Sequence, residues 1–305
     1  MKALVTGGAG FIGSHVADAL LGKGWDVVIL DNLATGSVAN VSSGARFFEG
    51  DAGDSGLLSQ VVPGCQAVFH LAAVSSVQDS IDRPLAVHDT NLTATLNLLE
   101  AAVRHRASRF VFSSSAAVYG DTGGRAARED MTPSPLSHYA VQKLACEYYC
   151  GVYRRLHGLE TVCLRYFNVY GPRQRADSPY SGVIAKFIDA AKADRPMTIY
   201  GDGQQTRDFC HVGNVVAANL AAASASSAAI ADGVFNIGSG TSVSVNELAD
   251  TIRSVSGSKT EPEHREARAG EINFSRADIS RASAQLAYRP SVQLGQGLAE
   301  LLNNA

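Results

Sequence analysis

The stretch TGGAGFIGSH, residues 6–15, decides the fold. It follows a short apolar run, Ala3–Thr6, and opens a segment with helical periodicity, Gly13–Gly24, so we expect a strand, a turn and a helix. Its three glycines follow a GxxGxxG spacing: Gly7, Gly10 and Gly13. Glycine permits a tight turn and close approach of a ligand to the backbone, and a helix N-terminus offers free N–H groups. The stretch therefore predicts a binding site for a pyrophosphate.

The next apolar run indicates which cofactor carries that pyrophosphate. Asp26–Asp31 (DVVILD) predicts a second strand that ends in a carboxylate, 18 residues after Gly13. A carboxylate at this place suits the ribose hydroxyls of NAD and repels the 2′-phosphate of NADP. Asp51, which follows a third predicted strand, could accept from the adenine amino group or could be an ordinary turn residue. Together these features predict an NAD site.

The rest of the chain predicts an α/β fold. Four further strands are expected at Arg46–Glu49, Ala67–Leu71, Arg109–Ser113 and Thr161–Arg165. Two helices are expected at Thr90–Arg104 and Tyr139–Leu156. Nearly continuous apolar strands separated by helices favour a parallel sheet that is covered on both faces. We predict a Rossmann-type, doubly wound parallel sheet with a smaller C-terminal lobe. The predicted domains are an NAD-binding domain, residues 1–170, and a substrate-binding lobe, residues 171–305, with some interleaving of segments.

Composition excludes several classes of partner. The 305 residues are 46% apolar and 18% charged, and the net charge of −3 leaves no basic surface for nucleic acid or for a membrane. Five scattered cysteines fit reduced thiols, and no apolar run reaches the roughly 18 residues that a membrane span needs. We expect a soluble, cytoplasmic protein. Cys146 and Cys150 lie one helical turn apart, but two thiols are too few for a zinc site, so no metal is predicted.

A tyrosine and a lysine on one helix suggest redox chemistry. Tyr139 and Lys143 are four residues apart, so they share one face of the predicted helix. A neighbouring ammonium and the positive nicotinamide would lower the pKa of the phenol and make it a usable base. The serines of residues 113–115 close a strand at the sheet edge where open α/β sheets bind ligands, and they could bind the reacting oxygen.

Eight motifs occur in the order of a known family. They are TGGAGFIGSH, DNL at 31–33, HLAA at 70–73, SSSAAVYG at 113–120, YAVQK at 139–143, RYFNVYGP at 165–172, GDGQQTRDF at 201–209 and RAGEI at 268–272. From residue 1 to about 290 the chain resembles the extended short-chain dehydrogenase/reductase family, specifically its nucleotide-sugar 4-epimerases. Two departures from the family pattern are His138, where proline is usual, and Gly213, where aspartate is common.

The resemblance implies a role for individual residues. The implied catalytic residues are Ser115, Tyr139 and Lys143. The implied NAD-binding residues are Gly7, Gly10, Phe11, Ile12, Asp31, Asn32, Asp51, Ala52, Leu71, Ala72, Ala73, Asn91, Ser113, Tyr139, Lys143 and Tyr166. The implied substrate-binding residues are Ser76, Ser115, Asn168, Gln174, Arg207, Arg268 and Ser275, with the two arginines on the diphosphate.

The implied reaction is a reversible oxidation at C4 of the sugar. Tyr139, assisted by Ser115, removes the 4-hydroxyl proton, hydride passes to NAD⁺, and the 4-keto sugar turns over before hydride returns to its other face. Relatives that dehydrate or decarboxylate carry acids just after the strand-end serine or threonine, whereas this chain has Ala116 and Ala117. Without an acid or base for C5, epimerisation is favoured.

The identity of the sugar is predicted mainly from the resemblance. Ser275 lies at the position where glucose-restricted epimerases carry a bulky tyrosine, and Ser76 and Gln174 lie where the acetamido group is expected. We therefore expect UDP-GlcNAc and UDP-GalNAc as substrates, together with UDP-Glc and UDP-Gal.

Two other functions fit the same residues. One alternative is a UDP-glucuronate 4-epimerase, for which Arg173 or Arg175 could bind the carboxylate. The other is a catalytically silent, NAD-sensing protein on the same fold. The family also implies a homodimer through the two long helices. The apolar stripe Leu92, Leu96, Leu99 and Val103 could serve that interface or could face the protein's own sheet.

Overall fold

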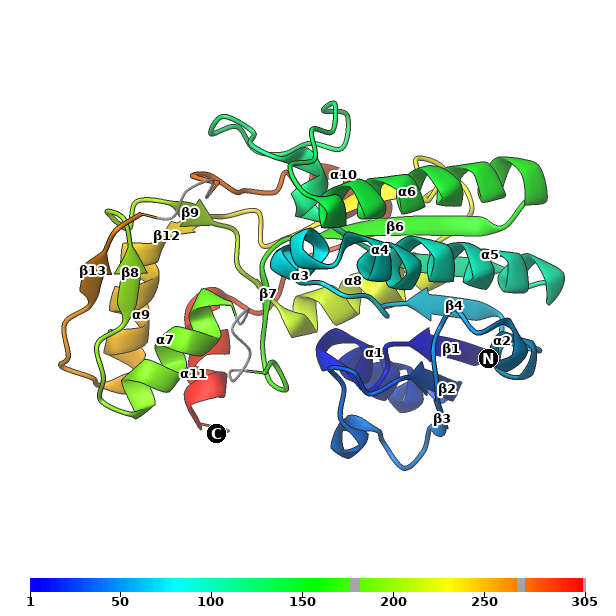
Figure 1. Ribbon diagram of the computed structural model, residues 1–305, viewed down its shortest axis with the longest axis horizontal. Helices are drawn as coiled ribbons and strands as arrows, with labels where there is room; N and C mark the ends of the chain where they lie inside the picture. Colours follow the sequence, from blue (N-terminus) through cyan, green and yellow to red (C-terminus); the bar gives the residue numbers. More distant parts are fainter. Residues whose placement is uncertain (176–181, 268–271, 304–305) are drawn as a thin grey trace.

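A seven-stranded parallel sheet forms the centre of the molecule in the computed structural model, which describes residues 1–175, 182–267 and 272–303 (Figure 1). From one edge to the other, the strands are β3 (Arg46–Glu49), β2 (Asp26–Asp31), β1 (Lys2–Thr6), β4 (Ala67–His70), β5 (Arg109–Ser115), β6 (Glu160–Tyr166) and β11 (Val234–Ile237). The order reverses between β1 and β4, which places a ligand-binding crevice at the carboxyl ends of these strands. The predicted Rossmann-type fold is confirmed.

Helices cover both faces of the sheet, so its strands are buried on two sides. One face packs against α1 (Phe11–Gly22) and α8 (Val212–Ser224) through an apolar core that includes Val16, Leu20 and Val215. The opposite face packs against α2 (Ser55–Val61), α5 (Ala94–Arg104) and α6 (His138–His157). This two-sided burial explains why the strands lack a polar/apolar alternation.

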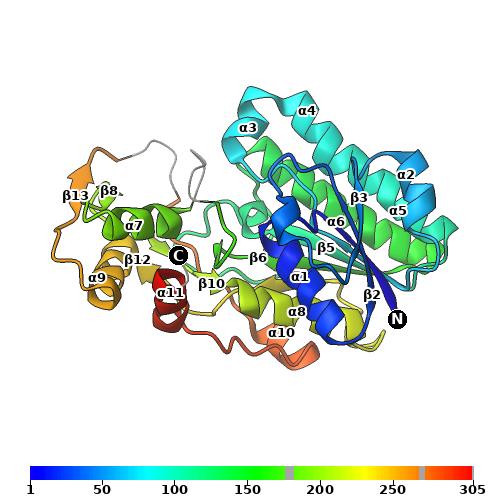
Figure 2. The same ribbon diagram turned by 90° about the horizontal axis from the view of Figure 1, so that it is seen from below.

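The smaller lobe lies beside the sheet, at the end where the strands point (Figures 1 and 2). Its own apolar core joins α7 (Val183–Lys192), α9 (Val245–Ser256) and α11 (Leu294–Asn303). Three small sheets complete it or connect it to the main sheet, formed by β8 (Thr198–Tyr200) with β13 (Glu263–Arg265), β9 (Thr206–Arg207) with β12 (Val243–Ser244), and β7 (Val169–Tyr170) with β10 (Cys210–His211). Because β11, α8 and α10 (Ser280–Gln285) contact the main sheet or its strands, the chain after residue 171 crosses between the two parts.

Local capping explains where the main helices begin and end. Gly10 is the extended N-cap of α1, so this helix starts at Phe11, two residues before the start that we predicted. The Ser137 hydroxyl accepts from the N–H of Ala140 and starts α6, and Gly158, in a left-handed conformation with φ of 69°, ends it.

The expected helix at Thr90–Arg104 is divided. α3 (Val77–Asp82) and α4 (Pro84–His88) lead into a π-helical turn, Asp89–Thr93, that continues into α5. In the predicted apolar stripe, Leu99 is fully buried and the other three residues are half-buried against the same core. The stripe therefore contributes to the protein's own core, mainly through Leu99. In the described part of the chain, no helix combines the length and apolar character needed to cross a bilayer.

Candidate active site

A large cleft runs across the carboxyl ends of the strands and into the smaller lobe. Its volume is about 1470 Å³, which exceeds the roughly 300–1,000 Å³ of a site for one small molecule. The cleft is lined by Gly7 after β1, Asp31 at the end of β2, Leu71 after β4 and Ser113 on β5. The cleft is therefore large and long enough to hold two ligands side by side.

The glycine turn at one end fits a pyrophosphate. Gly7 has a φ of 71°, and a side chain on Gly13 would place its Cβ 2.1 Å from the carbonyl oxygen of Gly7. Residues 7 and 13 therefore require glycine, since a Cβ at either place meets backbone atoms or strains the chain. No side chain caps the N-terminus of α1 at Gly10, so the N–H groups of this helix end remain directed at the cleft.

Two aspartates line the neighbouring part of the cleft. The Asp31 carboxylate accepts from the N–H of Ala9 at 2.9 Å and from that of Leu33 at 2.8 Å, which fixes its orientation. Each carboxylate oxygen keeps capacity to accept a further hydrogen bond, as the ribose hydroxyls of NAD require. Asp51 accepts from the N–H of Gly53 and from the Asn32 amide. The donor and acceptor chemistry at this end therefore fits NAD.

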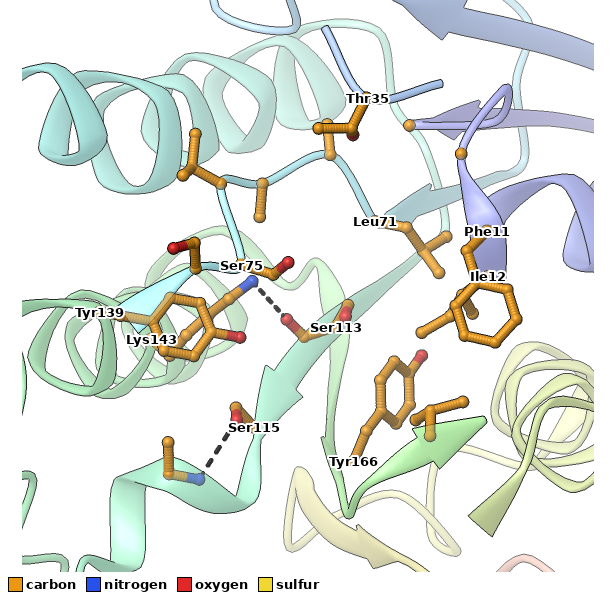
Figure 3. Close-up of a pocket in the computed structure, with 18 of the residues that line it drawn as sticks. Phe11, Ile12, Thr35, Leu71, Ser75, Ser113, Ser115, Tyr139, Lys143 and Tyr166 are labelled. Atoms are coloured by element: carbon orange, nitrogen blue, oxygen red, sulfur yellow. Dashed lines mark hydrogen bonds between the residues drawn. The ribbon is translucent and has the colours of Figure 1, made fainter. Parts of the chain in front are cut away.

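The three predicted catalytic residues meet at the middle of the cleft (Figure 3). Tyr139 and Lys143 come from the first turns of α6, and Ser115 ends β5. Figure 3 shows the Tyr139 hydroxyl directed toward the end of β5, where Ser113 and Ser115 lie. The Lys143 Nζ donates to the carbonyl oxygen of Ser113 at 2.7 Å and lies 5.8 Å from the centre of the Tyr139 ring.

Burial governs the ionisation of this trio. Burial raises the pKa of Tyr139, and its hydrogen bond with Ser115 acts in the opposite direction. Burial also lowers the pKa of Lys143 to about 8. The phenol is therefore a hydrogen-bonded acid in the protein alone. Its use as a base depends on the positive charges of Lys143 and of a bound nicotinamide, which favour the phenolate.

A buried ion pair lies directly behind the trio. Glu147 continues the Tyr139–Lys143 face of α6 by one more turn, and its carboxylate accepts from the Arg165 Nη2 at 2.6 Å and Nε at 2.8 Å. The Ser114 hydroxyl donates to the same carboxylate at 2.5 Å. These bonds join α6 to β5 and β6 next to the catalytic residues.

The cleft contains most of the residues that the resemblance implied. Every implied NAD-binding residue lines it except Asn91. Asn91 is buried and instead bonds both the N–H and the carbonyl of Val74, and its amide also donates to Gln142 on α6. It therefore supports the cleft wall rather than facing a ligand. Tyr166 lines the cleft, and its hydroxyl is bonded to Asn219.

The other end of the cleft holds the implied substrate-binding residues. Those that line it are Ser76, Ser115, Asn168, Gln174, Arg207 and Ser275. Arg268 lies outside the described residues. Ser76 also caps α3 by accepting from the N–H of Asp79, and the Gln174 amide donates to the carbonyl of Val169. Arg173, considered above for a carboxylate, is paired with Asp18 at 2.8 Å.

Sequence reasoning missed several residues that line the cleft. Figure 3 shows Ser75 beside Lys143 and Ser113 and Thr35 farther along the cleft, and Phe274 and Arg276 flank Ser275 in the cleft lining. They lie in loops without periodicity. Their proximity to recognised motifs was the one available signal, since Thr35 follows the DNL motif and Ser75 follows HLAA.

Comparison with known proteins identifies the family. The profile of the NAD dependent epimerase/dehydratase family matches residues 3–238. The chain is similar to the UDP-glucose 4-epimerase of Thermotoga maritima, solved with UDP-glucose, at 36% identity and a TM-score of 0.94, over 99% of this chain and 98% of that one.

Two further solved structures with other UDP-sugars are similar to this chain. A UDP-N-acetylglucosamine 4-epimerase from Methanobrevibacter ruminantium, in complex with UDP-N-acetylmuramic acid, has 37% identity and a TM-score of 0.93 over 99% and 97% of the two chains. A UDP-glucuronic acid 4-epimerase from Bacillus cereus, in complex with UDP-glucuronic acid and NAD, has 34% identity and a TM-score of 0.89 over 99% and 98%. The predicted family and the predicted cofactor, NAD, are confirmed, and the chain belongs to the NAD dependent epimerase/dehydratase family.

Proposed function

We propose that this protein is a UDP-sugar 4-epimerase that interconverts UDP-GlcNAc with UDP-GalNAc and UDP-Glc with UDP-Gal. The observation that carries the proposal is the convergence of Ser115, Tyr139 and Lys143 at the middle of a cleft large enough for two ligands. An NAD-binding turn lies at one end of that cleft and Arg207 at the other. The UDP-sugar complexes of the similar structures support the same substrate class.

The chain's own residues account for proton transfer and orientation. Tyr139 takes the proton of the sugar 4-hydroxyl, and Ser115, which bonds the same phenol, orients the oxygen that loses it. The positive charge of Lys143, whose Nζ lies 5.8 Å from the centre of the Tyr139 ring, favours the phenolate. Bound NAD⁺ supplies a hydride acceptor that later returns the hydride. Arg207 holds the nucleotide diphosphate while the sugar turns, and in the second half-reaction Tyr139 gives the proton back to the 4-oxygen of the sugar.

Absence of an acid at the strand end favours epimerisation over elimination. Ala116 and Ala117 line the cleft directly after Ser115. Relatives that dehydrate carry acidic side chains at these positions. Neither methyl group can remove or deliver a proton at C5. The 4-keto sugar is therefore left with one productive fate, which is reduction.

Small side chains in the sugar end support an acetylated substrate. Ser275 and Ser76 both line the cleft, and neither fills it as a tyrosine would. A coupled assay on UDP-GalNAc, UDP-Gal and UDP-glucuronate tests this proposal. We expect conversion of the first two, and a Ser275→Tyr variant should lose UDP-GalNAc selectively. Conversion of UDP-Gal alone would refute the acetylated part, and conversion of UDP-glucuronate alone would establish the uronate alternative.

We also propose a homodimer through the outer face of α6. Four large side chains on this helix are exposed: Val141, Tyr148, Tyr149 and Leu156. Apolar side chains that gather on one solvent-facing surface are typical of association sites. Sedimentation of the purified protein with NAD tests this, with a dimer expected and a monomer at micromolar concentration contradicting it.

A further inference from the structure

One carboxylate outside the cleft links several segments of its substrate wall. Asp208 directly follows the cleft residue Arg207, is fully buried and does not itself line the cleft. Its Oδ1 accepts from the N–H and the hydroxyl of Ser239, each at 2.7 Å. Its Oδ2 accepts from the N–H of Ala277 at 3.0 Å and from that of Gly240 at 3.1 Å. Four donors thus converge on one side chain from two distant segments.

The segments that meet at Asp208 carry the substrate-facing side chains. Ala277 immediately follows Ser275 and Arg276, which line the cleft. The carbonyl oxygen of Asp208 also accepts from the Asn168 amide at 3.2 Å, and Asn168 lines the cleft. Asp208 therefore connects Asn168 with the stretch that includes Ser275, through its backbone on one side and its carboxylate on the other.

Backbone hydrogen bonds of Thr206, two residues before Asp208, bring the same segments together. The N–H of Thr206 donates to the carbonyl of Asn273 at 2.8 Å, and the N–H of Ser275 donates to the carbonyl of Thr206 at 3.1 Å. Arg207 lies between Thr206 and Asp208, so both of its neighbours are bonded to the segment on which Ser275 lies. The position of the guanidinium relative to that segment consequently depends on these contacts.

The carboxylate packs closely against the backbone of Gly238. A Cβ on Gly238, the residue after β11, would lie 2.7 Å from the Asp208 Oδ2 and 2.8 Å from the Cβ of Ala277. The chain must therefore have glycine here, or the three segments would separate. A buried carboxylate held by four donors is a rigid connection, because each bond constrains the others.

We propose that Asp208 is a positioning residue for nucleotide-sugar binding. It holds Asn168, Arg207 and the stretch of Ser275 in the relative arrangement that receives the diphosphate and the sugar. The inference rests on the proposed function, because it assigns these residues to a UDP-sugar. It assigns Asp208 no part in NAD binding or in proton transfer.

The substitution Asp208→Asn tests the inference on the NAD-loaded protein. Each carboxylate oxygen accepts from two donors, so the amide nitrogen of asparagine would face two donors in either orientation. We expect KM for UDP-Gal and Kd for UDP to rise by at least about tenfold, with kcat within about threefold of wild type and with an unchanged NAD content. Asp278→Asn is the matched control, since Asp278 lies next to Ala277 and accepts from the N–H of Ser280 at the protein surface.

Three results would overturn the proposal. One is an Asp208→Asn protein that keeps wild-type KM and UDP affinity. Another is an equal effect of the control. The last is a parallel loss of NAD and UDP binding, which indicates general damage. If Asp208→Asn does not fold, Ser239→Ala removes one donor, and it should raise KM by about twofold or more without changing kcat, whereas no rise counts against the proposal. A wild-type protein that neither binds UDP nor epimerises UDP-sugars refutes the proposed function itself, which separates the two failures.

Discussion

Removal of the Glu147 carboxylate should destabilise the protein strongly. The Glu147 and Arg165 side chains are 3% and 4% exposed, and two charge-assisted hydrogen bonds join them. Ser114 donates a third bond to the carboxylate. In a Glu147→Met variant, the Arg165 guanidinium stays buried without a countercharge, next to the Tyr119 ring that it contacts at 4.7 Å.

The expected cost follows from the loss of one partner of a buried pair. Such a loss typically costs about 3–5 kcal/mol, out of a total free energy of unfolding of about 5–15 kcal/mol. Replacing both partners with apolar side chains of similar volume is often neutral, because no uncompensated charge remains. The double variant Glu147→Met/Arg165→Met should therefore recover most of the stability that the single variant loses.

Urea denaturation, followed by the fluorescence of Trp25 and by circular dichroism, measures these differences in the NAD-free protein. Asp130→Asn is the control, because the Asp130–Arg128 pair is exposed and its loss should leave the midpoint unchanged. A cost below about 1 kcal/mol for Glu147→Met, or a double variant no more stable than the single one, would refute the reasoning.

Three further predictions concern the cofactor turn, the catalytic lysine and the proposed dimer. Gly13→Ala places a Cβ 2.1 Å from the Gly7 carbonyl oxygen, so the purified variant should lack NAD, and an NAD content equal to wild type would contradict this. Burial lowers the pKa of Lys143 from 10.5 to about 8, so between these pH values the unfolded chain binds a proton that the folded protein has lost, and stability rises with pH. The free energy of unfolding of the wild type minus that of Lys143→Met should therefore increase from pH 8 to 10.5, and a flat difference in denaturant titrations would argue against a buried, perturbed lysine. Tyr148→Glu places a charge on the exposed face of α6 and should shift sedimentation toward a monomer, whereas Lys23→Glu, remote from α6, should not.

The local sequence pattern predicted most of the fold because the sheet is parallel and buried. Strands such as Asp26–Asp31 are nearly continuous apolar runs, and the glycine turn marks the junction of strand and helix. β11, however, joins the sheet beside β6 although about 70 residues separate them, and local patterns carry no information on such pairing. The π-helical turn at Asp89–Thr93 was missed because one inserted residue barely alters an apolar periodicity.

The residues of the candidate site likewise fall into a group that the sequence predicts and a group that only the folded chain reveals. Residues on motifs at strand ends, such as Asp31 and Ser115, were predictable because topology places every strand end at one edge. Phe274 and Arg276 reach the cleft through a loop that pairs with Thr206, and only the folded chain reveals that pairing. Asp208 resembled a mere neighbour of Arg207 in sequence, since its five hydrogen bonds all cross to segments that are distant along the chain.

The most direct test of the account compares wild type with Tyr139→Phe. The variant removes one hydroxyl from the middle of the cleft and leaves the glycine turn and Asp31 intact. Proton NMR of UDP-Gal incubated with each NAD-loaded protein should show conversion to UDP-Glc by the wild type. For the variant, we expect turnover reduced at least about a hundredfold at an unchanged NAD content. Turnover by the variant at the wild-type rate would contradict the assignment of Tyr139 as the base, and the absence of any UDP-sugar epimerisation by the wild type would contradict the proposed function.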